Sequence, residues 1–84
     1  MRHATPQMLK PLKPFFEKLG TLESLKEKKT GVYYFKSKAF LHFHEDDGRI
    51  FADVKLNPPA FDRVPATTET EQADLFESIR AFLE

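Results

Sequence analysis

Residues 32–56 read VYYFKSKAFLHFHEDDGRIFADVKL and contain the clearest turn signal in the chain, the dipeptide Asp47-Gly48. A two-residue Asp-Gly loop favours a type I′ β-hairpin, because both central residues need a positive φ and these residue types tolerate it best. The turn sets the pairing of the two strands and places His42 directly opposite Asp53. The sequence therefore predicts an antiparallel hairpin at the centre of the fold.

Side chains alternate between the two faces of a strand, so this register sorts the residues into two sets. One face is apolar and collects Ala39, Leu41, Phe43, Ile50, Ala52, Val54 and Leu56. The other face is mixed and collects Phe40, His42, His44, Phe51, Asp53 and Lys55. A shift of one residue would oppose the apolar set of one strand to the mixed set of the other. The turn and the hydrophobic pattern thus agree on one register.

A second hairpin is predicted upstream, where residues 36–39 separate the run 32–35 from the run that begins at Phe40. With Ser37-Lys38 as the turn, Tyr33 lies opposite His42 and Phe35 opposite Phe40. Tyr33, His42 and Asp53 then form one row across three strands. Neither Ser nor Lys favours a positive φ, so a longer loop with another register stays open.

Helices are predicted on both sides of these strands. Apolar residues from Met8 to Leu19 follow helical spacing, but Pro11 and Pro14 predict a break before a firmer helix that ends at Gly20, a natural left-handed C′ residue. Near the C-terminus, Thr68-Glu69-Thr70-Glu71 has the pattern of a capping box, and an apolar stripe continues to the end of the chain.

The remaining segments are less regular. Residues 1–4 are expected to be a loose terminus, and residues 21–29 fit either a helical turn or a lysine-rich edge strand, with the strand favoured. Residues 57–67 hold three prolines and predict an irregular loop. The whole chain, 1–84, is then one α+β domain: an N-terminal helix, an antiparallel meander of three to four strands, and a C-terminal helix packed on one sheet face.

Composition excludes several classes of protein. The 84 residues include no cysteine, so neither disulfides nor thiolate metal sites are expected. No apolar run approaches the roughly 20 residues of a membrane span, so we expect a cytoplasmic protein without a membrane partner. The three glycines stand apart and make no phosphate-binding loop, and no serine lies in a nucleophile elbow. No cofactor is expected, and an enzyme is disfavoured.

The mixed face is the predicted binding face, and its expected members are Tyr33, Phe35, Phe40, His42, His44, Phe51, Asp53 and Lys55. Such a face suits an unidentified protein partner, a ligand, or a second copy of the chain in a homodimer. A small metal-dependent or acid–base enzyme is an alternative, because His42, His44 and Asp53 could present two imidazoles and a carboxylate to one ion. The interpretation favoured over metal binding is that His42 is hydrogen-bonded to Asp53 or Tyr33 as a cross-strand pair, with His44 half-exposed.

Charge suggests a further alternative. The net charge is zero, yet basic residues concentrate in the first half of the chain and acidic residues in the second. Packing of the two halves against each other would neutralise this asymmetry. A nucleic-acid-binding domain is the other interpretation, and it would use Lys26, Lys28, Lys29, Lys36 and Lys38.

The string K-x-G-x-Y-Y-F-K-x-K-A-F-L-H-F-H resembles small uncharacterised bacterial α+β domains. It is distantly similar to the MmcQ/YjbR type, whose short hairpin pattern F-K-x-x-x-K-x-F-A corresponds here to Phe35, Lys36, Ala39 and Phe40. The resemblance covers about a third of the chain and implies an α+β fold. It also implies DNA binding, which has been proposed for that family from its fold. The C-terminal Gly-Tyr-His-Met-Asn string of the family is absent from this chain.

Overall fold

The computed structural model describes residues 2–84. In chain order its elements are β1 (Arg2–His3), the 3-10 helix η1 (Lys10–Leu12), α1 (Lys13–Leu19), β2 (Leu25–Lys29), β3 (Val32–Phe35), β4 (Lys38–Asp46), β5 (Arg49–Asn57), β6 (Ala60–Pro65) and α2 (Glu69–Leu83).

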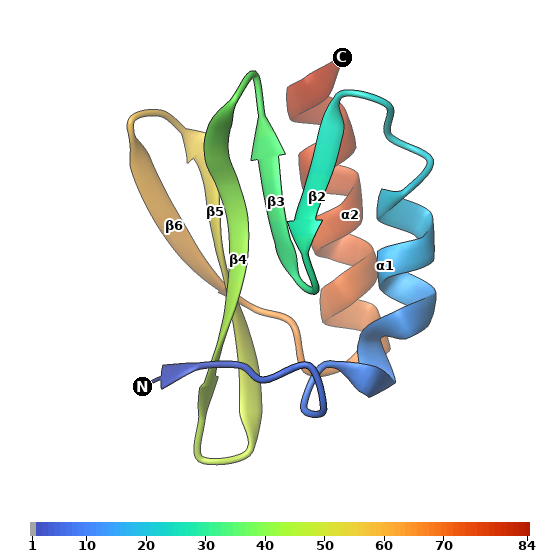
Figure 1. The fold of residues 1–84 in the computed structure, drawn as a ribbon, viewed down its shortest axis with the longest axis vertical. Helices are drawn as coiled ribbons and strands as arrows, with labels where there is room; N and C mark the ends of the chain where they lie inside the picture. The colour runs from blue at the N-terminus through green and yellow to red at the C-terminus, as the bar shows by residue number, and fades with distance from the viewer. Residues whose placement is uncertain (1) are drawn as a thin grey trace.

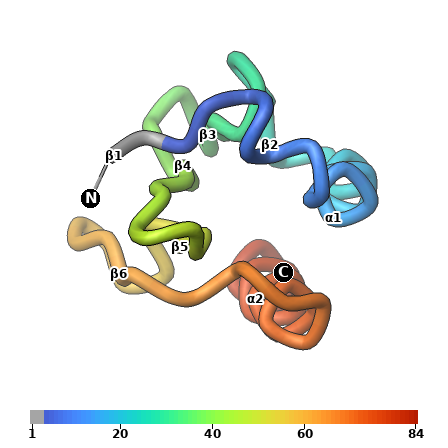
Figure 2. The backbone as a smooth tube through the Cα atoms, turned by 90° about the horizontal axis from the view of Figure 1, so that it is seen from below, coloured from blue at the N-terminus to red at the C-terminus, as the bar shows by residue number. Residues whose placement is uncertain are grey.

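The strands form one antiparallel sheet, in the order β2-β3-β4-β5-β6, and the short β1 pairs with the far end of β4 (Figure 1). The sheet curves around α1 and α2, which both lie on its one side (Figure 2). The predicted α+β class is therefore confirmed. The strand count exceeds the predicted three to four, because β6 and β1 add pairings that the sequence analysis did not foresee.

The central hairpin has the predicted register. The pairing of β4 with β5 begins next to the turn, where Asp46 lies opposite Arg49, and extends to Leu41 opposite Val54. Within it, His42 lies opposite Asp53. Both turn residues have a positive φ, 55° at Asp47 and 79° at Gly48, as a type I′ turn requires. The Asp-Gly signal and the apolar alternation thus determine the pairing of the two longest strands.

The hairpin between β3 and β4 differs from its prediction. Its turn is Lys36-Ser37, where both residues have a positive φ, and the register then shifts so that Tyr33 pairs with Leu41. The shift is a β-bulge on β4, because Phe40 is the additional residue between the pairs made by Ala39 and Leu41. Phe40 and Leu41 are consecutive, yet they are 2% and 0% exposed and both belong to the core. The predicted row of Tyr33 with His42 is therefore wrong.

Two segments predicted to be irregular are strands. Residues 60–65, within the expected loop 57–67, form the edge strand β6 on β5. An edge strand tolerates proline because one side of its backbone needs no partner in the sheet, and Pro65 is the last residue of β6. Arg2 and His3, expected in a loose terminus, pair with β4, and the Ala4 amide donates to the Phe43 carbonyl at 3.2 Å. Residues 25–29 form the favoured lysine-rich edge strand.

The helices begin close to where the sequence predicts. Pro11 lies in the first turn of η1 and Pro14 in the first turn of α1, so each proline occupies a position whose N–H needs no helical partner. Gly20 ends α1 with a φ of −63°, so it is not the predicted left-handed residue. The capping box of α2 is complete, since Thr68 Oγ1 accepts from the Glu71 amide and the Glu71 carboxylate accepts from the Thr68 amide.

The core lies between the helices and one face of the sheet. Its four largest fully buried side chains are Leu19 of α1, Ile79 of α2, Leu41 of β4 and Val54 of β5. Burial of an aliphatic side chain of this size contributes about 1.5–3 kcal/mol. The opposite sheet face lies away from both helices (Figure 2), and we call it the open face.

Candidate functional site

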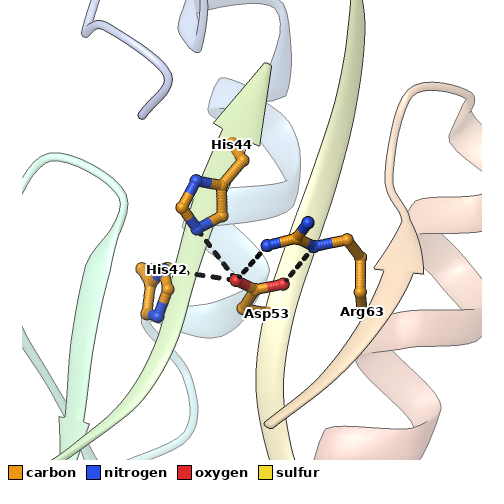
Figure 3. A network of polar contacts seen from close by, with 4 residues as sticks. All are labelled: His42, His44, Asp53 and Arg63. Atoms are coloured by element: carbon orange, nitrogen blue, oxygen red, sulfur yellow. Dashed lines mark hydrogen bonds and ion pairs between the residues drawn. The ribbon is translucent and has the colours of Figure 1, made fainter. Parts of the chain in front are cut away.

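A charged cluster lies on the open face where three strands run side by side. His42 and His44 come from β4, Asp53 from β5 and Arg63 from β6 (Figure 3). We call these four residues the Asp53 cluster. Asp53 is 8% exposed and is the one buried charged side chain among the described residues. A buried charge on an otherwise uncovered face is unusual, because a carboxylate loses hydration unless neighbours replace it.

The neighbours of Asp53 replace that hydration through close polar contacts. Arg63 donates from Nε to Oδ1 at 2.7 Å and from Nη2 to Oδ2 at 2.8 Å. His44 Nε2 lies 2.8 Å from Oδ2, and His42 Nδ1 lies 4.0 Å from the same oxygen. A guanidinium that binds both oxygens fixes the plane of the carboxylate. Asp53 is thus held in one orientation with Oδ2 turned toward both imidazoles (Figure 3).

The cluster keeps Asp53 ionised. The hydrogen bonds from Arg63, together with the charges of His44 and His42, lower the pKa of the Asp53 carboxyl, while partial burial acts in the opposite direction. The same hydrogen bonds raise the pKa of Arg63. Perturbed titratable groups that converge in this way mark candidate functional sites.

The structure divides the predicted binding face. His42, His44, Phe51, Asp53 and Lys55 do lie on the open face, as the confirmed register of β4 and β5 requires. Tyr33, Phe35 and Phe40 do not, because they face the helices. The predicted inclusion of these three aromatic residues is therefore wrong.

All three of these aromatic rings pack against the helices. Phe40 stacks on Phe82 of α2 at 5.5 Å between ring centroids, and Phe35 lies 6.0 Å from the same ring. Tyr33 is 3% exposed and packs against Phe16 of α1. Burial, with the adjacent carboxylate of Glu27, raises the pKa of Tyr33. The bulge at Phe40 causes this exchange of faces, because it reverses the alternation of β3 relative to β4.

Two aromatic residues of the open face were missed by the sequence analysis. Tyr34 follows Tyr33 and so takes the opposite face, and Phe61 lies in the segment predicted to be a loop. Phe61 is 40% exposed, and its ring lies 5.0 Å from that of His42. The alternation F-D-R-V in residues 61–64 was the signal that could have identified β6, with Arg63 on the same face as Phe61.

Each aromatic ring of the open face has a cation beside it. Lys28 Nζ lies 5.5 Å from the Tyr34 ring centroid, Lys55 Nζ lies 4.8 Å from that of Phe61, and the Arg49 guanidinium lies 5.6 Å from that of Phe51. These distances are within the range of cation–π attraction. The face therefore alternates aromatic rings with exposed or half-exposed positive charges.

The five predicted lysines do not form one stripe. Lys26 pairs with Tyr34 across β2 and β3, Lys28 lies beside the same ring, and Lys29 pairs with Val32, so these three accompany the open face. Lys36 and Lys38 instead border a hollow with Phe35, Phe40 and Phe82 at the end of the molecule that holds the β3–β4 turn.

A groove adjoins the Asp53 cluster. It has a volume of about 570 Å³ and lies at the start of β3, between the part of β4 that pairs with β3 and the part that pairs with β1. His42 and Tyr34 line it on the sheet, Lys29 and Gly31 at the β2–β3 turn, and Leu9 on the N-terminal segment. His42 thus belongs both to the charged cluster and to a hollow large enough for a small ligand.

No protein-family model, curated protein or solved structure matches this chain. The similarity to the MmcQ/YjbR type therefore stays a prediction that rests on the quoted residues. Within residues 2–84, no helix is long and apolar enough to cross a membrane.

Proposed function

We propose that the chain is a non-catalytic binding module that takes single-stranded nucleic acid on its open face. One observation carries the proposal: Tyr34, Phe51 and Phe61 occupy the uncovered sheet face, each with a cation within 5.6 Å of its ring. Proteins that bind single strands combine aromatic side chains, on which bases stack, with basic side chains that follow the phosphates.

The charge balance of the open face supports a polyanion. Six cations accompany it, namely Lys26, Lys28, Lys29, Arg49, Lys55 and Arg63. Two acids share it, Asp46 and Asp53, which gives a balance of +4 among the side chains that the structure describes. Asp53 is also neutralised by Arg63, which weakens its repulsion of phosphate. A lysine beside a ring can move onto a phosphate when a base takes its place on the ring.

The same balance disfavours the homodimer that the sequence suggested. Two copies meeting through the open face would bring like charges together, which costs several kcal/mol at a desolvated interface. An acidic protein partner would satisfy the cations but would leave the exposed ring of Phe61 without a stacking partner. A nucleic acid strand offers both phosphates and flat bases.

Fluorescence anisotropy with a labelled oligothymidylate of about 12 nucleotides tests the proposal, since single-strand sites span roughly 4–16 nucleotides per domain. We expect binding at low salt that weakens as salt rises, with a log–log slope of about −0.7 per phosphate contacted. Three or four contacts give a slope of about −2 to −3. A duplex of the same length should bind more weakly, because its bases are already stacked.

Two pairs of variants separate stacking from charge. Phe61→Leu keeps apolar bulk but removes the flat ring, and we expect it to weaken binding by about 1–3 kcal/mol. Phe61→Tyr keeps a flat ring and should bind like the unmodified protein. Lys28→Gln should weaken binding and reduce the salt slope. Lys13→Gln, the same charge change at an exposed position of α1, should do neither.

Three results would contradict the proposal. The oligonucleotide could fail to bind at tens of micromolar protein and low salt. A polyglutamate peptide could bind as tightly as the oligonucleotide, which would indicate an acidic protein partner. A doubled mass in light scattering that Phe61→Leu reverses would indicate that a second copy occupies the open face.

A further inference from the structure

We propose that His42, His44 and Asp53 form a binding site for one divalent transition-metal ion, with zinc as the ion that fits best. Their ligand atoms, one nitrogen from each ring and one carboxylate oxygen, all lie within 4.8 Å of one another. The three residues come from two strands whose register is set by the Asp47-Gly48 turn. The site is thus built on rigid, hydrogen-bonded elements rather than on a loop.

The spacing of the ligand atoms suits a small ion. Zinc holds nitrogen and oxygen ligands at about 2.0–2.2 Å, so ligands of a tetrahedral site lie about 3.3–3.6 Å from one another. The observed separations from Asp53 Oδ2 are 2.8 Å to His44 Nε2 and 4.0 Å to His42 Nδ1, one below and one above that range. Binding of zinc would therefore require the two imidazoles to adjust by rotation of their side chains.

The arrangement of the rings also favours a shared ion. His42 and His44 alternate along β4 and point the same way, with ring centroids 4.9 Å apart and ring planes at 75° (Figure 3). Steeply inclined rings let two nitrogen lone pairs converge on one point, whereas stacked parallel rings would direct them apart. Two imidazoles and a carboxylate are the ligand types that zinc and similar ions bind.

Arg63 would be the outer partner of the carboxylate. Its Nε donates to Oδ1, the oxygen that faces away from the imidazoles, and this bond can persist when Oδ2 binds an ion. Its Nη2 contact with Oδ2 would have to lengthen. The Arg63 side chain is 47% exposed, so it has room to turn. Metal-binding carboxylates are commonly oriented by such a second hydrogen bond.

The groove lies beside one of the three ligands, His42. Three protein ligands leave a tetrahedral ion one position for water or for a small ligand. His42 lines the groove of about 570 Å³, whereas His44 and Asp53 do not, so the groove approaches the site from the side of His42. The proposal does not depend on nucleic acid binding, since zinc is measured alone and the stacking residues are not ligands.

Isothermal titration of zinc into the unmodified protein at about pH 7.5 gives the first test, because zinc binds imidazole in its neutral form. We expect one ion per chain. NMR of the same sample should show the ring resonances of both His42 and His44 moving together. The melting temperature should rise with zinc concentration, because an ion that binds only the folded state stabilises it.

Variants then locate the ion. His42→Gln, His44→Gln and Asp53→Asn should each weaken zinc binding by about tenfold or more. Asp47→Asn is the matched control, since it makes the same acid-to-amide change in the hairpin turn, where Asn-Gly suits the type I′ geometry equally well. It should bind zinc like the unmodified protein.

Two outcomes would overturn the proposal. One is the absence of any response in the two imidazole resonances at about millimolar zinc, which would leave the cluster as a purely hydrogen-bonded network. The other is zinc binding that the three ligand variants do not weaken, which would indicate an adventitious ion only. The NMR measurement uses the unmodified protein, so it decides the question even where one of the variants fails to fold.

Discussion

Gly31 offers the sharpest test of how the groove is built. It lies in the β2–β3 turn with a φ of +77°, a conformation that side chains disfavour. A Cβ placed there would lie 2.6 Å from Cδ1 of Leu9, which is itself buried at 3% exposure. Gly48 has nearly the same φ, +79°, but nothing lies within 4 Å of its added Cβ. The two glycines thus have nearly the same φ, but only at Gly31 would an added Cβ meet a neighbouring side chain.

This difference predicts two separable free-energy costs. The left-handed conformation costs an alanine about 1–2 kcal/mol, and this applies to both Gly31→Ala and Gly48→Ala. Forcing an additional methyl group into a packed site costs about 1–3 kcal/mol more, and this applies to Gly31→Ala only. We therefore expect Gly48→Ala to lower the free energy of unfolding by about 1–2 kcal/mol and Gly31→Ala by about 2–5 kcal/mol.

Urea denaturation followed by circular dichroism measures both variants. Leu9→Val removes the δ-carbon that Gly31→Ala would meet, so the double variant should be less destabilised than the sum of the two single ones. A coupling of about 0.5–3 kcal/mol is expected for residues in contact. Equal destabilisation by Gly31→Ala and Gly48→Ala, or the absence of coupling to Leu9, would refute the close packing of the β2–β3 turn against the N-terminal segment.

Two further predictions concern the Asp53 cluster and α2. Because the pKa of Asp53 is lowered in the folded state, its contribution to stability is present above the ordinary aspartate value of about 4 and is lost as the pH falls through the lower folded value. Urea midpoints at about pH 7 and about pH 3 should therefore differ less in Asp53→Asn than in Asp47→Asn, and an equal difference would contradict the network. Thr68→Ala removes the acceptor for the Glu71 amide and should cost about 0.5–2 kcal/mol, whereas Thr70→Ala in the same turn should change stability by less than about 0.5 kcal/mol. Thermal unfolding of the two variants measures this difference. An equal loss of stability in Thr68→Ala and Thr70→Ala would contradict the role of Thr68 as the helix cap.

The hairpin and the last helix were predictable because their signals are local. Asp47-Gly48 needs only its own backbone preferences to form the turn, and the alternation of apolar residues on either side leaves one register. The capping box at Thr68 likewise uses groups three residues apart. From the same hairpin followed the correct placement of His42 opposite Asp53, with His44 on the same face.

The sequence by itself therefore determined the α+β class, the β4–β5 pairing, the ends of α2 and three members of the charged cluster. Tertiary structure alone decided which aromatic residues stay uncovered, because the bulge at Phe40 exchanges the faces of Tyr33 and Tyr34 to fill the core beneath the helices. It also decided that residues 60–65 form a strand, since pairing with β5 stabilises a segment whose own preferences are those of a loop. That pairing places Arg63 beside Asp53, ten residues earlier in the chain. No local sequence signal predicts this contact, because it forms only when β6 pairs with β5.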